Sequence, residues 1–233
     1  MKFAELRNRV LQANYDIVTA GLVLLTWGNA SAADREAGVM AIKPSGVSYD
    51  TLSAESIPVV ALDSGEVVDG VHKPSSDTAT HLELYRRFAM VGGIVHTHSH
   101  YAVCFAQAEQ PLPCLGTTHA DHFLTEVPAT RLLTAEEIAG EYEKNTGTVI
   151  VERFHSGGYD PLRTPAVLVA QHGPFAWGAT VEIAVENAIV LEEVARMALH
   201  TQLLAPQANA ADRALVERHF FRKHGPGAYY GQH

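Results

Sequence analysis

The sequence has few cysteines and no long apolar run, and both absences narrow the kind of protein that it encodes. Its two cysteines, Cys104 and Cys114, are too few for a disulfide scaffold and are compatible with a reducing compartment. No apolar run reaches the roughly 18 residues that a membrane-spanning helix needs. The first ten residues mix charged and apolar side chains and do not resemble a signal peptide. We therefore expect a cytoplasmic protein that does not act at a membrane.

Basic residues are also scarce, whereas histidine is abundant. Seventeen Lys and Arg stand against 26 Asp and Glu, which gives a net charge of −9 with histidine neutral. This balance argues against binding to nucleic acid or to an anionic membrane, so an anionic substrate must be held locally by backbone amides and a few donors. The 13 histidines instead direct attention to metal binding or acid–base chemistry.

The composition is that of a globular chain able to bury a core. Of 233 residues, 47% are hydrophobic and 18% are charged, which excludes disorder, collagen and coiled coil. The sequence contains no repeat and no Pro/Gly-rich linker, so we expect a single domain over residues 1–233, with the C-terminal segment 225–233 as a mobile flap.

Short apolar runs bounded by turn residues predict strands. They cover residues 22–27, 39–43, 58–62, 66–68, 94–98 and 166–171. Helical spacing of apolar residues predicts helices from the N-terminus to about Gly21, from residue 77 or 78 through 88, over 135–145, over 180–200 and over about 209–223. In the helix 180–200, Ile183, Val190, Val194 and Met197 are expected to face inward. The pattern indicates an α/β domain built on one mixed or antiparallel sheet.

Two histidines two positions apart in a strand are candidates for a metal site. His96 and His98 point to the same face of the predicted strand, and His172 follows a distant strand at a Gly-Pro turn. Three histidines with an open position suit catalytic zinc, and Asp77 could add a carboxylate. On the residues alone, surface histidines on a strand and a plain helix N-cap at Asp77 remain open interpretations.

Three turns of small residues could hold a phosphate. Gly28-Asn29, Ser45-Gly46 and Ser75-Ser76 each combine backbone N–H groups with amide or hydroxyl donors, and Lys43 could add a positive charge. Each turn taken alone fits an ordinary turn better than a binding site.

Two segments carry acid–base candidates. Asp121 lies in a segment rich in donors and titratable groups, 117–122, and Tyr230 lies in the C-terminal tail. Asp121 could instead close a turn, and Tyr230 could simply anchor the tail by packing.

Seven blocks in order along the chain resemble the class II aldolase/epimerase family. They are TWGNAS (26–31), IKPSGV (42–47), KPSSDTATH (73–81), GGIVHTHS (92–99), GTTHAD (116–121), HGPFAWG (172–178) and RKHGPGAYYGQ (222–232). The resemblance runs over essentially the whole chain. Within the family, the blocks are most similar to the L-ribulose-5-phosphate 4-epimerases.

This resemblance implies a three-layer α/β/α fold and a fourfold-symmetric homotetramer with active sites between neighbouring subunits. It implies a divalent metal, zinc or in some members manganese, held by His96, His98 and His172 with Asp77 at the metal site. Asp121 and Tyr230 match the paired acid–base residues, with the tyrosine coming from the adjacent subunit. The implied substrate-binding residues are Gly28, Asn29, Lys43, Ser45, Gly46, Ser75 and Ser76, and the supporting residues are Thr117, Glu143, His219 and Arg222.

The implied reaction interconverts L-ribulose 5-phosphate and D-xylulose 5-phosphate. The C4–H bond of the substrate is not acidic, so the expected route is retro-aldol cleavage of C3–C4 followed by re-addition to the other face, with the metal as Lewis acid. Epimerases of arabinose breakdown and of ascorbate breakdown share these motifs, so both pathways stay open.

Three alternatives are weighed against this interpretation. An aldolase acting on fuculose 1-phosphate or rhamnulose 1-phosphate is the nearest, but the fuculose type has glutamate where Asp77 stands. A non-catalytic binding module like the adducin head lacks the metal histidines. An oxygenase with a His/carboxylate facial triad would leave the phosphate-type turns without a role.

Overall fold

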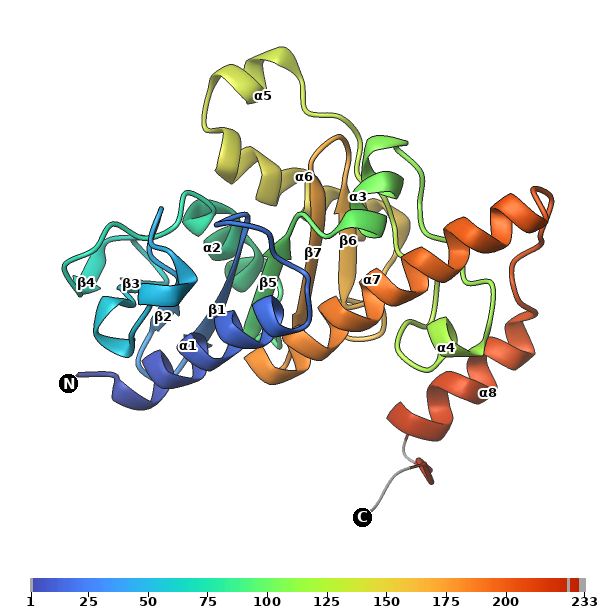
Figure 1. Ribbon diagram of the computed structural model, residues 1–233, viewed down its shortest axis with the longest axis horizontal. Helices are drawn as coiled ribbons and strands as arrows, with labels where there is room; N and C mark the ends of the chain where they lie inside the picture. Colours follow the sequence, from blue (N-terminus) through green and yellow to red (C-terminus); the bar gives the residue numbers. More distant parts are fainter. Residues whose placement is uncertain (1, 226, 231–233) are drawn as a thin grey trace.

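One antiparallel sheet forms the centre of the molecule. In the computed structural model, which describes residues 2–225 and 227–230, seven strands pair in the order β4-β3-β2-β1-β5-β7-β6 (Figure 1). They are β1 (Gly28–Asp34), β2 (Val39–Ile42), β3 (Val59–Ala61), β4 (Val67–Asp69), β5 (Gly93–Thr97), β6 (Ala166–Val169) and β7 (Gly173–Gly178). Every pairing between these strands is antiparallel. The prediction of an α/β domain around a central sheet is confirmed.

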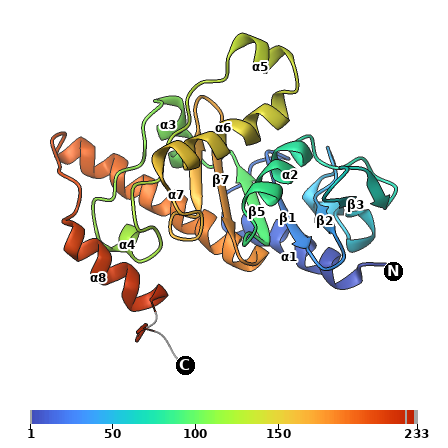
Figure 2. The ribbon, with the colours of Figure 1, turned by 180° about the vertical axis from the view of Figure 1, so that it is seen from behind.

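Helices cover both faces of this sheet. One face packs against α1 (Ala4–Thr19), α3 (His100–Gln107) and α7 (Val181–Leu204), and the other against α2 (Thr78–Arg87) and α6 (Tyr142–Gly157) (Figures 1 and 2). Alternation along the strands explains the two layers: Ala41 belongs to the apolar cluster on the first face, while Met40 and Ile42 belong to the cluster on the second. This is the predicted three-layer arrangement.

The remaining elements lie at the margins of the sheet. Two 3-10 turns, η1 (Tyr49–Thr51) and η2 (Ala54–Ser56), follow β2, and α5 (Ala135–Ala139) precedes α6. The short helix α4 (Thr117–Ala120) packs against α8 (Arg213–His224) at one side of the molecule (Figure 1). Within the part of the chain that the structure describes, no helix is long and apolar enough to cross a membrane.

The predicted strand at 22–27 is wrong. These residues form a loop in which Leu24 and Leu25 are exposed, and the strand begins only at Gly28. The real strand, β1, has the sequence GNASAAD, whose small side chains fit between β2 and β5 in the middle of the sheet. The apolar run therefore predicted the strand one segment too early in the chain. At the centre of this sheet, small side chains fit better than bulky apolar ones.

Two other expectations are corrected in detail. The helix predicted over 135–145 divides at Gly140 into α5 and α6, and α6 continues to Gly157. In α7, Val194 is buried as expected, but Ile183 and Met197 are each 43% exposed. Residues 63–65 form the turn between the paired strands β3 and β4, and Thr134 and Glu137 form a capping box at the start of α5.

A glycine brings the sheet centre and α7 into unusually close contact. A Cβ added at Gly93, the first residue of β5, would overlap the backbone of Val181 at the start of α7. Only glycine fits this approach. It seats the strand that carries His96 directly against the helix.

Candidate metal centre and substrate pocket

Three histidines converge at one end of the sheet. His96 lies in β5, His98 follows the end of that strand, and His172 lies in the tight turn between β6 and β7. Since β7 pairs directly with β5, the turn is placed beside the strand end. One ligand nitrogen from each ring lies within 4.8 Å of the others, so one ion could be shared by all three. The predicted histidine triad is therefore brought together, and its donors fit a divalent metal such as zinc.

The surroundings of these rings favour the neutral imidazole that a metal requires. His96 Nδ1 donates to the Pro174 carbonyl oxygen at 3.0 Å, which leaves Nε2 with a free lone pair. Burial, with repulsion from His96 and His98, lowers the pKa of His172 to about 3. Burial and His96 likewise lower the pKa of His98. At neutral pH the rings of His98 and His172 are thus unprotonated and available as ligands.

Asp77 faces the histidines but is held by an amide. Its Oδ2 accepts a hydrogen bond from Asn29 Nδ2 at 2.6 Å, and Asn29 is the cross-strand partner of His96. Burial alone would raise the pKa of Asp77, but His96 and His81 nearby and the Asn29 hydrogen bond lower it. The residue stands at the N-cap position of α2 without capping that helix through its side chain. Asp77 therefore presents a negative charge toward the triad, although it is not part of the convergent ligand group.

The three small-residue turns surround the same cavity. Its volume is about 460 Å³. Its lining includes Gly28, Asn29, Lys43, Ser45, Gly46, Ser75, Ser76 and Asp77 together with His96, His98 and His172. Pro44 and Pro74 form an isolated antiparallel bridge, and the Ser45 backbone N–H donates to the Lys73 carbonyl oxygen, so the second and third turns are tied to each other. Segments distant in sequence thus form one polar pocket next to the histidines.

Lys43 has a structural role that its position in the sequence did not suggest. Its ammonium group donates to the carbonyl oxygens of Val47 at 2.7 Å and Pro44 at 3.3 Å, and it lies 4.7 Å from the centre of the Tyr49 ring. Burial lowers its pKa. The lysine therefore holds the shape of the Ser45-Gly46 turn as well as contributing charge at the pocket wall.

Two neighbouring residues at the start of α6 complete the wall. Glu143, predicted as a supporting residue, lines this pocket within a single chain. Tyr142, which the sequence analysis missed, lines it too, with its hydroxyl 3.4 Å from His172 Nδ1 and its ring stacked on that imidazole. The only sequence signal for Tyr142 was its position beside Glu143.

A second residue missed by the sequence analysis, a histidine, lies beneath the pocket. His81 is fully buried on α2; its Nδ1 is 2.7 Å from Ser31 Oγ, which in turn is 2.8 Å from the Tyr85 hydroxyl. Burial lowers the pKa of His81 to about 3. The ring is therefore a neutral, hydrogen-bonded part of the core below Asp77.

Asp121 lies in a separate cluster formed by α4 and α8. Arg222 donates to both of its carboxylate oxygens at 3.1 and 2.8 Å, and His219 Nδ1 lies 3.0 Å from Oδ1. Burial would raise the pKa of Asp121, but the hydrogen bonds from Arg222 and His219 lower it. Thr117 begins α4, the helix that Asp121 ends. The carboxylate is therefore ionised and fixed in place.

Tyr230 lies against the same arginine. Its ring centre is 4.7 Å from the Arg222 guanidinium carbon, and its backbone N–H donates to the Arg222 carbonyl oxygen. The flap predicted over 225–233 falls partly on residues 226 and 231–233, which lie outside the described residues. Within the chain, Tyr230 and Asp121 thus share one partner.

The two groups of predicted residues are not joined within one chain. Asp121, Tyr230, His219, Arg222 and Thr117 do not line the histidine pocket, among the residues described. Both views place α4 and α8 at one side of the molecule, whereas α6, whose first turn borders the pocket, lies near its middle (Figures 1 and 2). The structure therefore assembles the metal and substrate candidates but leaves the acid–base candidates apart from them.

Comparison with known proteins places these features in a family. The model for the "Class II Aldolase and Adducin N-terminal domain" matches residues 8–199, well over half of the chain. A solved L-fuculose 1-phosphate aldolase is similar at 25% identity and a TM-score of 0.79, over 94% of this chain and 96% of that one. The L-fuculose-1-phosphate aldolase of Thermus thermophilus is similar at 27% identity and a TM-score of 0.67, over 87% of this chain and 98% of that one.

A more distant structure shares the fold alone. An aldolase II superfamily protein from Pseudomonas syringae is 14% identical with a TM-score of 0.72, over 97% of this chain and 88% of that one. The two proteins thus share the arrangement of sheet and helices although their sequences differ at most positions.

Proposed function

The chain belongs to the family of class II aldolases and adducin N-terminal domains, and from this premise we propose that it is a metal-dependent L-ribulose-5-phosphate 4-epimerase. Class II aldolases use a divalent metal, usually Zn²⁺. The observation that carries the proposal is that His96, His98 and His172 share one pocket with all three small-residue turns. The pocket thus offers a metal site beside donors suited to a phosphorylated sugar.

The pocket suits a small phosphorylated ketose. The backbone N–H groups of Gly46 and Ser76 and the serine hydroxyls of both turns are donors of the kind that a phosphate requires, while the backbone N–H groups of Ser45 and Ser75 tie the turns together on one wall. Asn29 orients the Asp77 carboxylate toward the histidines at the other end. A ketopentose 5-phosphate could therefore place its phosphate in the turns and its carbonyl end at the triad.

Inversion at C4 requires breaking and remaking the C3–C4 bond. A base removes the proton of the C4 hydroxyl, the C3–C4 electron pair moves to the dihydroxyacetone fragment as its enediolate, and glycolaldehyde phosphate forms. A divalent ion bound by the triad would supply Lewis-acid stabilisation of that negative charge. The turns retain the phosphate while the aldehyde rotates, and an acid on the other face returns the proton after re-addition.

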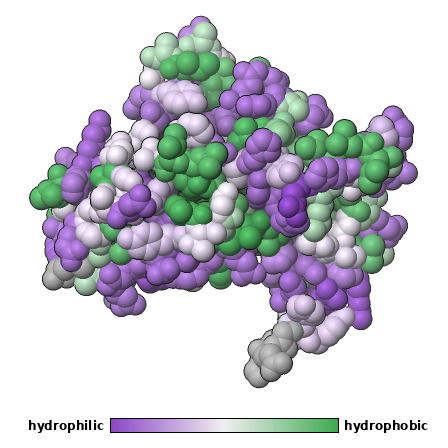
Figure 3. Space-filling model, viewed as in Figure 1, coloured by the Kyte–Doolittle hydropathy of each residue, from purple (hydrophilic) through white to green (hydrophobic). Residues whose placement is uncertain are grey.

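We assign these two proton transfers to Asp121 and Tyr230. Both lie outside the pocket of their own chain, so the proposal requires a neighbouring subunit to bring them to it, as in a homotetramer, with the C-terminal tail closing over the site. His219 and Arg222 hold Asp121 in place, and we assign Thr117 and Glu143 as supporting residues where the two subunits meet. Exposed apolar side chains on α7 offer a contact surface, and apolar areas lie over this helix in Figure 3. They are Ile183, Ile189, Met197, Leu203 and Leu204.

A class II aldolase acting on L-fuculose 1-phosphate is the second candidate. Two solved proteins that bear this name are similar to the chain over most of its length. Against it, the resemblance places glutamate in such enzymes where Asp77 stands here. The shorter Asp77 is held by Asn29 at 2.6 Å and reaches less far into the pocket as a base.

The test is NMR of L-ribulose 5-phosphate with zinc-loaded protein and with chelator-treated protein. Appearance of D-xylulose 5-phosphate only with metal, and without free fragments, supports the epimerase. Accumulation of dihydroxyacetone and glycolaldehyde phosphate indicates an aldolase instead. If neither sample changes the substrate, L-fuculose 1-phosphate is tested next, and failure there leaves a non-catalytic binding module.

A further inference from the structure

Tyr142 lies between α5 and His172, and it contacts the His172 imidazole with both its ring and its hydroxyl. Its hydroxyl lies 3.4 Å from His172 Nδ1. Its ring lies 6.1 Å from the imidazole centre at an interplanar angle of 29°, which is a stacked arrangement. Ring and hydroxyl together restrict how the imidazole can turn. The Tyr142 side chain therefore restrains His172, the one residue of the triad that lies in a turn rather than in or next to a strand.

His96 already shows what such a partner does. Its Nδ1 is used by the Pro174 carbonyl oxygen, which leaves Nε2 for an ion, and its ring stacks on Phe175. His172 has the same two kinds of contact, a stacked ring and an oxygen at Nδ1, but both come from Tyr142. A partner on the other ring nitrogen commonly fixes the tautomer and direction of a histidine ligand.

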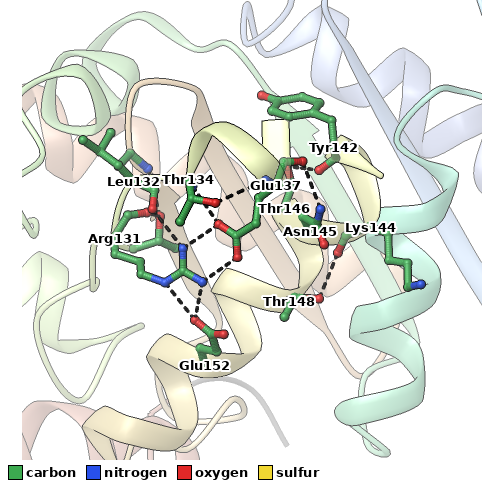
Figure 4. Close-up of polar contacts among 12 residues, drawn as sticks. Arg131, Leu132, Thr134, Glu137, Tyr142, Lys144, Asn145, Thr146, Thr148 and Glu152 are labelled. Carbon is green, nitrogen blue, oxygen red and sulfur yellow. Dashed lines mark hydrogen bonds and ion pairs between the residues drawn. The ribbon is translucent and has the colours of Figure 1, made fainter. Parts of the chain in front are cut away.

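The position of Tyr142 depends on polar contacts made by α5. This helix, described throughout, has no buried residue, so apolar packing does not hold it. Arg131 instead donates to both carboxylate oxygens of Glu137 at 2.7 and 2.8 Å and forms an ion pair with Glu152 of α6 at 2.9 Å (Figure 4).

The same network reaches the first turn of α6. The Glu137 backbone carbonyl oxygen accepts a hydrogen bond from Asn145 Nδ2 at 2.9 Å. Figure 4 shows Tyr142 at the start of this helix, above Asn145 in the view. The Arg131–Glu137–Asn145 contacts therefore fix the helix start that aims Tyr142 at His172.

We propose that Tyr142 is a positioning residue: its hydroxyl accepts from His172 Nδ1–H, so that Nε2 of this ligand faces the metal, and the Arg131–Glu137–Asn145 contacts hold it there. The inference rests on the metal site of the proposed function. It adds a residue that acts through His172 and not on the substrate.

The test compares Tyr142→Phe, which keeps the ring, with Tyr159→Phe as the matched control. Tyr159 gives its hydroxyl to Glu126 at 2.9 Å and does not line the pocket. Zinc affinity is measured by competition with a chromophoric chelator. We expect Tyr142→Phe to bind zinc about tenfold more weakly, a typical effect of losing such a partner. Tyr159→Phe is expected to match the wild type, and Arg131→Gln to lose about threefold, as an exposed ion pair allows.

A second readout does not need the metal. Nitrogen-15 NMR of the imidazoles in metal-free protein should show His172 with its proton on Nδ1 in the wild type, and a mixture of tautomers in Tyr142→Phe. Equal zinc affinity and identical His172 spectra in the two proteins would overturn the proposal. If the wild type itself binds no zinc, the metal site and this inference both fail. If zinc binds normally but no sugar phosphate turns over, only the proposed activity fails.

Discussion

At the scale of single residues, Asp121 shows how two basic side chains fix a charged group before any substrate is present. Replacing it by asparagine keeps the shape and removes the carboxylate that Arg222 and His219 hold. If Asp121 transfers a proton, kcat of Asp121→Asn should fall by about 10² to 10⁴-fold, the usual contribution of a general acid or base.

Steady-state turnover of L-ribulose 5-phosphate is the measurement, with Asp63→Asn in the exposed hairpin turn as the control. A thermal melt of each variant separates lost chemistry from lost folding. Full turnover by folded Asp121→Asn would remove the residue from the acid–base role.

The buried histidines make stability depend on pH. His119 Nε2–H donates to the Thr125 carbonyl oxygen at 2.8 Å, Nδ1 has no partner among the described residues, and burial lowers the pKa to about 4. Because the unfolded chain has a histidine pKa of about 6.5, it binds the extra proton first as the pH falls. Stability is therefore retained above about pH 6.5 and lost from there toward about pH 4.

The measurement is denaturant unfolding of metal-free protein at several pH values in this range. His119→Gln, which keeps an N–H donor but does not titrate, should lose less free energy of unfolding, the difference being at most about 1.4 kcal/mol per pH unit. The same dependence of unfolding free energy on pH in both proteins would contradict the role of His119. Some dependence is expected in each protein, because His81 and His172 are present in both.

Single residues were predictable where local geometry dictates a direction. Strand alternation alone puts His96 and His98 on one face, and the structure brings His172 to them. Tyr142 was not predictable, since its contact with His172 depends on where α5 ends and α6 begins. That break, at Gly140, was itself missed in a pattern that is typical of one helix.

At the scale of elements, α3 depends on a carboxylate from another helix. Glu192 of α7 accepts hydrogen bonds from the backbone N–H groups of Tyr101 at 2.8 Å and Ala102 at 2.9 Å, in the first turn of α3. That helix starts two residues after His98. Glu192 therefore caps α3 across the fold and anchors the chain just beyond the metal candidates.

Glu192→Ala should lower the free energy of unfolding by about 1–3 kcal/mol, because two part-buried N–H groups lose a charged acceptor. Glu193→Ala is the neighbouring control: among the residues that the structure describes, Glu193 forms an exposed ion pair with Arg196, worth about 0–1 kcal/mol. Chemical denaturation of both variants provides the comparison. Equal losses would show that the cap contributes nothing specific.

Elements were predictable where apolar side chains mark them and were missed where they do not. The segment 22–27 has the apolar run of a strand but forms a loop, while β1 is built of small residues that no strand propensity favours. Likewise, the outward position of Ile183 and Met197 on α7 reflects a surface that a single chain leaves uncovered.

At the scale of the whole molecule, the separation of the two residue groups predicts that subunits complement one another. His96→Ala removes a metal ligand candidate, and Asp121→Asn removes an acid–base candidate. If each active site takes its metal from one subunit and Asp121 from the next, a mixture refolded from both inactive variants regains part of the activity.

Turnover of the mixture is compared with that of each variant refolded alone and at the same concentration. Recovery only in the mixture supports shared sites. No recovery in mixed oligomers, identified by native mass spectrometry, would place each complete site within one chain. The residues of the sequence could not predict whether the sites are shared between subunits, because composition does not reveal an interface. Only the family resemblance implied shared sites.

The histidine site also bears on the order of events during folding. His96 and the Pro174 carbonyl that fixes its tautomer are 78 positions apart in the chain, and they meet only when β5 pairs with β7. Contacts across such long loops form late, because the chain entropy of closing them is lost before the contact is gained. A metal added at the start of refolding should thus be captured only in the final phase, and the moment of capture would time the closure of the central sheet.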